Sequence, residues 1–351
     1  MHSTPDFSAR LVKWHERHGR HDLPWQRTRD PYRVWLSEIM LQQTQVATVI
    51  PYYQRFLERF PDLATLAAAP VAEVMALWSG LGYYARARNA HACAKAVMRE
   101  HGGSFPREAS LIGRLPGIGP STANAIAAFC FGASTVILDG NVKRVLCRHF
   151  GLSGYPGKPA VEKELWRRAE ALAPPRATGT YNQAQMDLGA TVCTRAKPRC
   201  NACPLAETCV ALRQGTVGQL PEGRPRRVLP NRETAVLLLI DAGRALLHHR
   251  PPSGIWGGLW SLPELPQEAD PVAYAATALG CEVDSFLALT PVQHAFTHFR
   301  LTLQPLLGHA RLLPQVAEAD GERWLARPEL AAAALPAPIR KLLEAALQAA
   351  G

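Results

Sequence analysis

Two carboxylates occur in contexts that would give them different protonation states. Glu38 lies in the segment VWLSEIML, and its neighbours at helical spacing are the apolar Val34, Trp35 and Leu41. If this segment is a helix, these side chains share a face with Glu38, and a carboxyl on an apolar face has a raised pKa. The alternative is a helix edge at which Glu38 reaches solvent. The first arrangement predicts an acid that keeps its proton available.

Asp139 lies in TVILDGNVKRVL, where an extended segment gives way to a helical pattern. Aspartate is favoured at helix N-caps, which is the ordinary explanation for this residue. The capping box is missing because position 142 is valine. The helix dipole also favours the ionised carboxylate. The sequence therefore offers one proton donor and one anion, the pair that cleavage of an N-glycosidic bond needs.

Four cysteines cluster in one short segment, with the spacing C-x6-C-x2-C-x5-C. They are Cys193, Cys200, Cys203 and Cys209. Four thiolates this close suit either a tetrahedral zinc site or an iron–sulfur cluster. The segment TRAKPR between the first two cysteines carries three basic residues, which either contact phosphates or form a solvated basic loop.

The segment LPGIGPSTAN at 115–124 predicts a turn followed by a helix. Gly117 and Gly119 allow positive φ angles and expose backbone N–H groups, and Pro120 suits the first turn of a helix. A helix N-terminus beside a glycine turn is an anion site, although a tight connection between two helices would use the same residues.

Taken together, the cysteine spacing and LPGIGPSTA resemble the endonuclease III and MutY group of DNA base-excision glycosylases, in particular its MutY type. The resemblance implies a mainly α, two-lobed helix-hairpin-helix glycosylase domain with an iron–sulfur loop, plus a smaller α+β Nudix-like C-terminal domain. It implies a [4Fe–4S] cluster on the four cysteines. It also implies that backbone amides at Gly117 and Gly119 grip a DNA phosphate.

The same resemblance assigns roles to single residues. Glu38 matches the acid that protonates adenine, Asp139 the anion that stabilises the oxocarbenium ion, and Asn141 an asparagine beside the sugar. Ser121 stands where bifunctional members carry the lysine that forms a Schiff base, and a hydroxyl cannot form an imine. Base removal without efficient strand cleavage is therefore expected. Further residues matched to contacts with the substrate are Trp25, Gln43, Thr44, Leu81, Tyr83 and Gln183.

The C-terminal part resembles a Nudix domain that has lost its chemistry. GIWGGLWSLPE at 254–264 resembles the start of a Nudix box, but the stretch 271–281, where an acidic metal-binding helix should follow, contains no acid. In MutY proteins such a domain checks for 8-oxoguanine opposite adenine. Phe296, Thr297 and His298 resemble its reading loop, with threonine in place of a more usual serine.

Composition and patterning agree with a DNA-binding protein. The 351 residues include 39 basic and 29 acidic ones, a net charge of +10 that suits a polyanionic partner. The longest apolar stretch is broken by Pro70 and Glu73, and the N-terminus lacks the apolar core of a signal peptide. We therefore expect a protein of the cytoplasm, associated with the nucleoid and not with membranes.

Helical periodicity extends to about residue 215, and strand patterns follow it. TAVLLLI and RALLHH predict a hairpin, FRLTLQPLL predicts a further strand, and the C-terminal segment 328–351 predicts a helix. The predicted domains are a glycosylase domain, an exposed linker and a Nudix-like domain. Their bounds are 1–214 (a six-helix module at about 28–132; an iron–sulfur module at 1–27 and 133–214), 215–233 and 234–351.

The resemblance implies a monomeric enzyme that removes adenine mispaired with 8-oxoguanine or guanine in double-stranded DNA, with replication or mismatch-repair proteins as further partners. Three alternatives stay open: a bifunctional glycosylase for damaged pyrimidines, a nucleotide pyrophosphatase and a DNA-binding protein without catalysis. Ser121 and Glu38 oppose the first, and the missing acidic helix opposes the second.

Overall fold

The structure is a computed structural model that describes residues 4–225, 228–312 and 321–349. Internal contacts divide the chain into two compact units, Met1–Ala68 with Asn89–Arg226 and Ala69–Arg88 with Arg227–Gly351. Within the described ranges, no helix combines the length and the apolar character needed to cross a bilayer.

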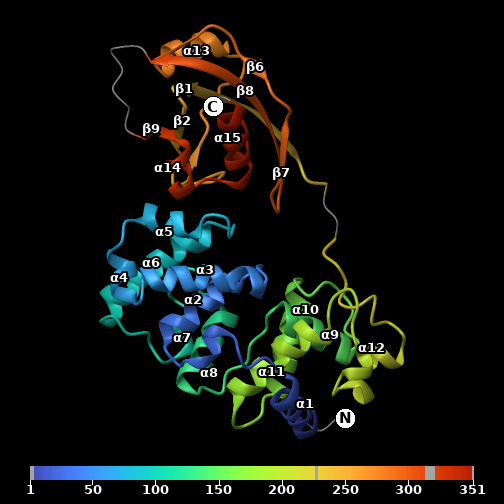
Figure 1. Ribbon diagram of the computed structural model, residues 1–351. Coiled ribbons are helices and arrows are strands. Elements are labelled where there is room, and N and C mark those ends of the chain that lie inside the picture. The colour runs from blue at the N-terminus through green and yellow to red at the C-terminus, as the bar shows by residue number, and fades with distance from the viewer. Residues whose placement is uncertain (1–3, 226–227, 313–320, 350–351) are drawn as a thin grey trace. The chain divides into compact units, whose positions relative to one another are not determined.

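The first unit is helical and runs from blue to yellow in Figure 1. Its α-helices are α1 (Thr4–His18), α2 (Pro31–Leu41), α3 (Val46–Arg59), α4 (Leu63–Ala68), α7 (Ala109–Ile112), α8 (Pro120–Phe131), α9 (Gly140–Phe150), α10 (Pro159–Ala171), α11 (Thr178–Thr191) and α12 (Val210–Arg213). Short 3-10 helices are η1 (Pro24–Arg27), η2 (Cys200–Ala202) and η3 (Ala206–Thr208). Helix α6 (Ala85–His101) begins in the other unit and continues into this one.

Helix α2 begins at a capped proline and is buried on most sides. Asp30 accepts a hydrogen bond from the backbone N–H of Tyr32 and is the N-cap, while Pro31 takes the first helical position, where it loses no bond. Trp35 is fully buried, and the Tyr32 hydroxyl donates to the carbonyl of Phe60 at 2.6 Å. These contacts fix the helix that carries Glu38.

The hairpin between α7 and α8 needs glycine at one position only. Gly117 has φ of 74°, and a Cβ there would lie 2.6 Å from Cβ of Asn89. Gly119 is the N-cap of α8 with φ of −90°, and its Cβ would meet nothing within 4 Å. The expectation that both glycines use positive φ is therefore wrong for Gly119, because an extended N-cap suits any residue.

Helices α1, α9, α10 and α11 share one apolar core. Phe7, Leu146, Leu165 and Leu188 each contribute a buried side chain from a different helix. Helix α11 approaches α9 so closely at Gly189 that a Cβ there would lie 2.6 Å from Cβ of Asn141. The missing side chain lets the first turn of α9 rest directly on α11.

The predicted exposed linker at 215–233 is partly anchored on the helical unit. Leu220 is buried, and its carbonyl accepts a hydrogen bond from Nε of Arg148 at 2.7 Å. Glu222 accepts the backbone N–H of Gly154 at 2.6 Å. Polar partners on the helices thus fix a segment whose composition alone predicts solvent exposure.

The second unit contains a mixed sheet, drawn in yellow to red in Figure 1. Its strands are β1 (Asn231–Asp241), β2 (Arg244–His249), β3 (Trp260–Ser261), β4 (Glu264–Leu265), β5 (Cys281–Val283), β6 (Leu287–Ala288), β7 (Val292–Ala295), β8 (Arg300–Leu312) and β9 (Glu322–Ala326). The central order is β3-β2-β1-β8-β5, with β1 and β8 parallel. The unit also holds α5 (Val71–Trp78) and α13 (Pro271–Ala278).

The predicted hairpin and the strand FRLTLQPLL are confirmed. Strands β1 and β2 pair antiparallel with Asp241 opposite Arg244. The intervening Ala242 and Gly243 both have positive φ, as a two-residue hairpin turn requires. The single helix predicted for the C-terminal segment is wrong in detail. It is divided into α14 (Arg327–Ala332) and α15 (Ala337–Ala349), and Pro336 precedes the second.

Gly189→Ala should destabilise the protein by about 1–3 kcal/mol, because its Cβ must displace the start of α9. Gly140→Ala is the matched control, since a Cβ at that glycine meets nothing within 4 Å. Urea unfolding of both variants measures the difference. Equal stability of the two variants would contradict the close packing of α9 on α11.

Candidate active site

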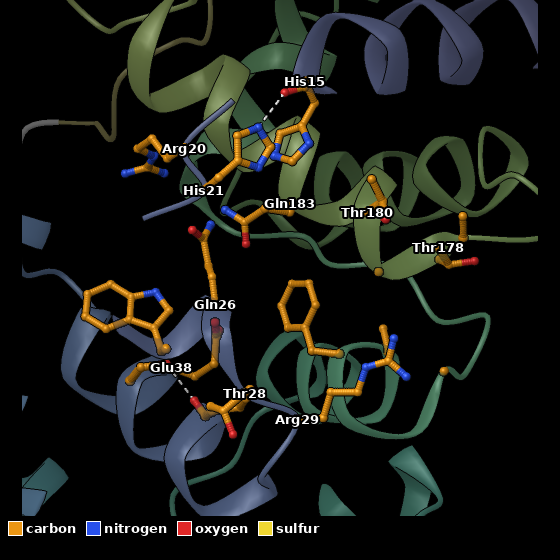
Figure 2. Close-up of a pocket in the computed structure, with 18 residues that line it drawn as sticks. His15, Arg20, His21, Gln26, Thr28, Arg29, Glu38, Thr178, Thr180 and Gln183 are labelled. Carbon is orange, nitrogen blue, oxygen red and sulfur yellow. Dashed lines mark hydrogen bonds between the residues drawn. The ribbon is translucent and has the colours of Figure 1, made fainter. Parts of the chain in front are cut away.

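A pocket of about 440 Å³ opens in the helical unit. Its walls come from the end of α1 with the loop after it, η1, α2, α8 and the start of α11. Figure 2 shows Glu38 reaching it from α2 and Gln183 from α11. Its lining residues with charged or amide side chains or imidazole rings are His15, Arg20, His21, Gln26, Arg29, Glu38 and Gln183. The pocket therefore combines one carboxyl with several hydrogen-bond donors.

Glu38 is partly buried on α2, next to the fully buried Trp35 and Ser37. Burial raises the pKa of Glu38 to about 7, and the negative charge of Asp139 acts in the same direction. A carboxyl with this pKa is protonated in a large fraction of molecules at neutral pH. The prediction of a proton-holding acid at Glu38 agrees with this environment.

Asp139 is the N-cap of α9 and accepts the backbone N–H of Val142 at 2.7 Å. Burial raises the pKa of Asp139 above its ordinary value, although the hydrogen bonds from Val142 and Asn141 lower it. The sequence predicts that the helix N-terminus favours the ionised carboxylate, and the structure adds a larger, opposing effect of desolvation on the pKa of Asp139. Asp139 is not among the pocket-lining residues of the described chain, yet its charge acts on Glu38.

Asn141 connects Asp139 to Arg144 through hydrogen bonds at the start of α9. Its Nδ2 donates to Asp139 at 2.9 Å, and its Oδ1 accepts from Nη2 of Arg144 at 2.8 Å. The same guanidinium donates to the carbonyls of Gly189 and Cys193 at 2.8 and 2.7 Å. Arg144, which the sequence analysis did not single out, therefore links the cysteine segment to the start of α9.

Ser121 lies in the first turn of α8 and is partly buried. Its hydroxyl accepts the backbone N–H of Leu138 at 3.1 Å, immediately before Asp139. Asn182 holds the same segment from α11, because it accepts from Ile137 at 3.3 Å and donates to the carbonyl of Thr135 at 2.8 Å. The serine thus helps to position the chain that leads to Asp139.

Of the residues matched to substrate contacts, Trp25 and Gln183 line the pocket with Glu38. Trp25 is buried in η1, with its ring edge to face against Tyr53 at 5.4 Å. Gln43 and Thr44 lie beyond the end of α2 and do not line the pocket as described. Gln43 has φ of 57°, an unusual value for a residue other than glycine.

Three residues of this region were missed by the sequence analysis. Asp187 is fully buried on α11, and both its oxygens accept hydrogen bonds from Arg20. Nε2 of His15 lies 3.2 Å from its Oδ2. No motif joins these positions, because Arg20 and Asp187 are far apart in sequence and meet only through the packing of α1 on α11.

In the second unit, Leu81 and Tyr83 differ in exposure. Leu81 is buried, whereas Tyr83 is 49% exposed and has φ of 49°. The guanidinium of Arg86 lies 5.4 Å from the Tyr83 ring centroid. Of these two residues, both matched to substrate contacts, Tyr83 presents the larger accessible surface.

Phe296, Thr297 and His298 form the turn between β7 and β8. The N–H of Phe296 donates to the carbonyl of Phe299 at 2.9 Å, and the two rings stack with centroids 4.5 Å apart. Thr297 and His298 lie at the tip, with Oγ1 and Nδ1 3.4 Å apart in an exposed contact. A rigid aromatic base therefore supports two polar side chains.

Two family models match the chain. Residues 36–171 match the HhH-GPD superfamily of base excision DNA repair proteins, and residues 235–345 match the NUDIX domain. An adenine DNA glycosylase of Buchnera aphidicola subsp. Baizongia pistaciae is 35% identical over 96% of this chain and 95% of its own length. The Homo sapiens adenine DNA glycosylase is 35% identical over 96% of this chain and 73% of its own length.

The chain belongs to the adenine DNA glycosylase family.

Solved structures support the fold expected of this family. A thermostable thymine-DNA glycosylase matches with a TM-score of 0.56 and 29% identity, covering 60% of this chain and 97% of its own. A trapped endonuclease III–DNA covalent intermediate matches with a TM-score of 0.53 and 21% identity, covering 61% of this chain and 99% of its own. The predicted fold class, a mainly helical helix-hairpin-helix domain with a smaller α+β Nudix-like domain, is confirmed.

The Nudix-like part of this glycosylase lacks the acidic helix of a working Nudix box. Helix α13 contains no acidic residue, and Glu264 forms an ion pair with Arg250.

The four cysteines line one small cavity together with Arg148. Nη1 of Arg148 lies 3.4 Å from Sγ of Cys193. Among the described residues, no group of three or more His, Cys, Asp or Glu side chains is arranged to hold a single metal ion. Four cysteines that line one cavity are a donor set that fits either an iron–sulfur cluster or a zinc ion.

Asp139→Asn should lower the pKa of Glu38 below about 7, because it removes the negative charge that raises it. Titration of carbon-13-labelled glutamate by NMR measures this change. Asp62→Asn is the control, since Asp62 lies before α4, on a different cavity. A Glu38 pKa that stays constant in Asp139→Asn would contradict the coupling of the two carboxyls.

Proposed function

We propose that this enzyme removes adenine mispaired with 8-oxoguanine or guanine from duplex DNA, by hydrolysing the N-glycosidic bond as the first step of base excision repair. The observation that carries the proposal is Glu38, a carboxyl with a pKa raised to about 7 at the wall of a pocket large enough for a purine. Relatives named adenine DNA glycosylase over 96% of the chain support the choice of base.

Glu38 acts as the general acid. Adenine is a poor leaving group until a ring nitrogen is protonated, and a carboxyl that keeps its proton near neutral pH can supply that proton. The sugar then develops positive charge, which Asp139 stabilises once it is ionised. Because the charge of Asp139 raises the pKa of Glu38, the two groups favour the state with one proton, located on Glu38.

The target nucleotide must leave the base stack to reach this pocket, which costs a few kcal/mol. Trp25 lines the pocket and offers an aromatic surface to the extruded base. We assign Gln43, which has a positive φ, and Thr44 to the gap left in the duplex and to contacts with the opposite base. Leu81 and the exposed Tyr83 are assigned to a wedge beside that base. The backbone at Gly117 and Gly119 is assigned to a phosphate.

The reaction is hydrolysis without efficient strand cleavage. Ser121 has a hydroxyl, which cannot form the imine that β-elimination requires. The Ser121 hydroxyl already accepts a hydrogen bond from Leu138, so it serves the positioning of Asp139. Bifunctional enzymes carry a lysine at this position. In this chain Ser121 stands there instead and holds the segment before Asp139.

The loop Phe296–His298 is assigned to recognition of 8-oxoguanine opposite adenine. Thr297 and His298 offer hydrogen-bonding groups on an aromatic base. Release of pyrophosphate from nucleotides is not proposed, because α13 carries no acid.

A [4Fe–4S] cluster bound by Cys193, Cys200, Cys203 and Cys209 is part of the proposal, and the cavity that these residues line supports it. When bound, such a cluster would cross-link the segment and hold its basic residues in place for contact with phosphates. Arg144 bonds to the carbonyl of Cys193 and to Asn141, so order in the cysteine segment extends to the start of α9. The cytoplasmic location and replication or mismatch-repair partners stay predictions.

Glu38→Gln should slow adenine release from an adenine:8-oxoguanine duplex by at least about 100-fold, because the amide cannot donate the proton. In the unmodified enzyme the single-turnover rate should fall as pH rises through about 7, where Glu38 loses its proton. The variant should lack this decline. A wild-type rate that stays level through this range would contradict the assignment of the acid.

The same single-turnover assay tests whether the enzyme recognises the base opposite adenine. Adenine opposite 8-oxoguanine and opposite guanine should react, whereas adenine opposite thymine should react far more slowly. His298→Ala should reduce the rate opposite 8-oxoguanine more than the rate opposite guanine. Equal rates on all three duplexes would exclude mispair recognition.

Purified protein should contain iron and acid-labile sulfide in equal amounts, and Cys203→Ser should lose both. Val217→Ala is the control, because Val217 lines the same cavity without a thiolate. Elemental analysis measures both contents. Stoichiometric zinc without sulfide would contradict the cluster.

A further inference from the structure

Asp187 is a buried carboxylate that takes no part in the proposed reaction. It lies on α11 and is fully buried. Its Oδ2 accepts the backbone N–H of Arg20 at 2.7 Å, and its Oδ1 accepts Nε and Nη2 of the same residue at 2.8 and 2.6 Å. Nε2 of His15 lies 3.2 Å from Oδ2. Burial opposes the charge, but the bonds from His15 and Arg20 hold the pKa of Asp187 below its usual value.

The same carboxylate holds a side chain of the pocket. Gln183, one helical turn earlier on α11, donates from Nε2 to Oδ1 of Asp187 at 2.9 Å. Gln183 lines the pocket with Glu38, and Figure 2 shows it among the lining side chains, near Gln26. Asp187 itself does not line the pocket in the described chain, so it acts through Gln183.

This bond fixes which end of the amide is engaged. An ionised carboxylate only accepts hydrogen bonds, so Gln183 must present its NH2 group to Asp187. Its Oε1 is then left as an acceptor for a ligand. Turning the amide over would bring two oxygens together beside a buried charge, which is strongly unfavourable.

A second amide in the pocket, that of Gln26, is held through its oxygen instead of its nitrogen. Oε1 of Gln26 accepts the backbone N–H of Leu23 at 3.3 Å. Nε2 of Gln26 is buried and has no hydrogen-bond partner among the described residues. Gln26 lines the same pocket. The pocket therefore offers an acceptor from Gln183 and an unused donor from Gln26.

Adenine presents the complementary pair, since its exocyclic amine donates and the adjacent ring nitrogen accepts. A base with an oxygen at position 6, such as hypoxanthine or guanine, presents an acceptor where Gln183 also presents one. A site built to bond an N–H rejects an analogue that lacks it. With position 6 of the base facing Gln183, a fixed amide orientation would favour a 6-amino purine over a 6-oxo purine.

We propose that Asp187, anchored by Arg20 and His15, is a positioning residue that fixes the Gln183 amide with its oxygen toward the base, and thereby selects a 6-amino purine over a 6-oxo purine. This inference rests on the proposed function. The inference assigns part of the preference for adenine to Asp187, which acts through Gln183 and does not line the pocket in the described chain.

The test compares single-turnover release of adenine and of hypoxanthine, each opposite 8-oxoguanine, by the full-length protein. Asp187→Asn replaces one acceptor by an N–H donor, which lets the Gln183 amide adopt both orientations. The ratio of the adenine rate to the hypoxanthine rate should fall about tenfold, as expected for one hydrogen bond. Leu188→Ala, a cavity variant at a buried neighbour on α11, should leave this ratio unchanged.

A double-variant cycle shows whether Asp187 acts through Gln183. Gln183→Leu alone should lower the ratio, and Asp187→Asn added to it should change the ratio no further. Gln183→Leu also tests the inference should Asp187→Asn fail to fold, because Gln183 is only partly buried.

Two results would overturn the inference: an equal fall of both rates in Asp187→Asn with an unchanged ratio, or an unchanged ratio in Gln183→Leu. The absence of adenine release by the unmodified protein is a different outcome, which would refute the proposed function itself.

Discussion

The chemistry proposed for this protein depends on two carboxyl groups, Glu38 and Asp139, because the negative charge of Asp139 raises the pKa of Glu38. The pKa of Glu38 reaches about 7 because burial removes water from the carboxyl and because the charge of Asp139 acts on it. Neither cause is local, since tertiary packing buries the helix from which Glu38 projects, and Asp139 comes from a distant part of the chain. A displacement of α2 or of the start of α9 would therefore change the pKa of Glu38.

Several contacts in the helical unit hold the start of α9 in place. Ser121 and Asn182 bind the extended segment before Asp139 from two different helices. Arg144 bonds to Asn141 on one side and to carbonyls of Gly189 and Cys193 on the other. The cysteine segment is therefore connected to the carboxylate of Asp139 through one guanidinium group. If the proposed cluster is bound, this connection would transmit order from the cysteine segment to the start of α9.

The second unit combines the sheet of a NUDIX domain with a helix that lacks acidic residues. The sheet around β1 and β8 forms within the described residues, and the family model for the NUDIX domain matches 235–345. Yet α13 carries no acid, and Glu264 is neutralised by Arg250. Thr297 and His298 belong to the loop between β7 and β8. The sheet can hold this loop in place whether or not the domain binds a metal ion.

The sequence by itself was enough to predict the fold class and the family, because the cysteine spacing and LPGIGPSTA resemble those of known glycosylases. It also indicated Glu38, Asp139 and the four clustered cysteines as candidate site residues, whose roles stay predictions. It did not determine that Gly119 is extended, that burial outweighs the helix dipole at Asp139, or that the linker is anchored at Leu220. Only the tertiary structure decided that Arg20 and Asp187 meet beside Gln183. Desolvation and long-range hydrogen bonds depend on which distant segments pack together, and no local pattern encodes that.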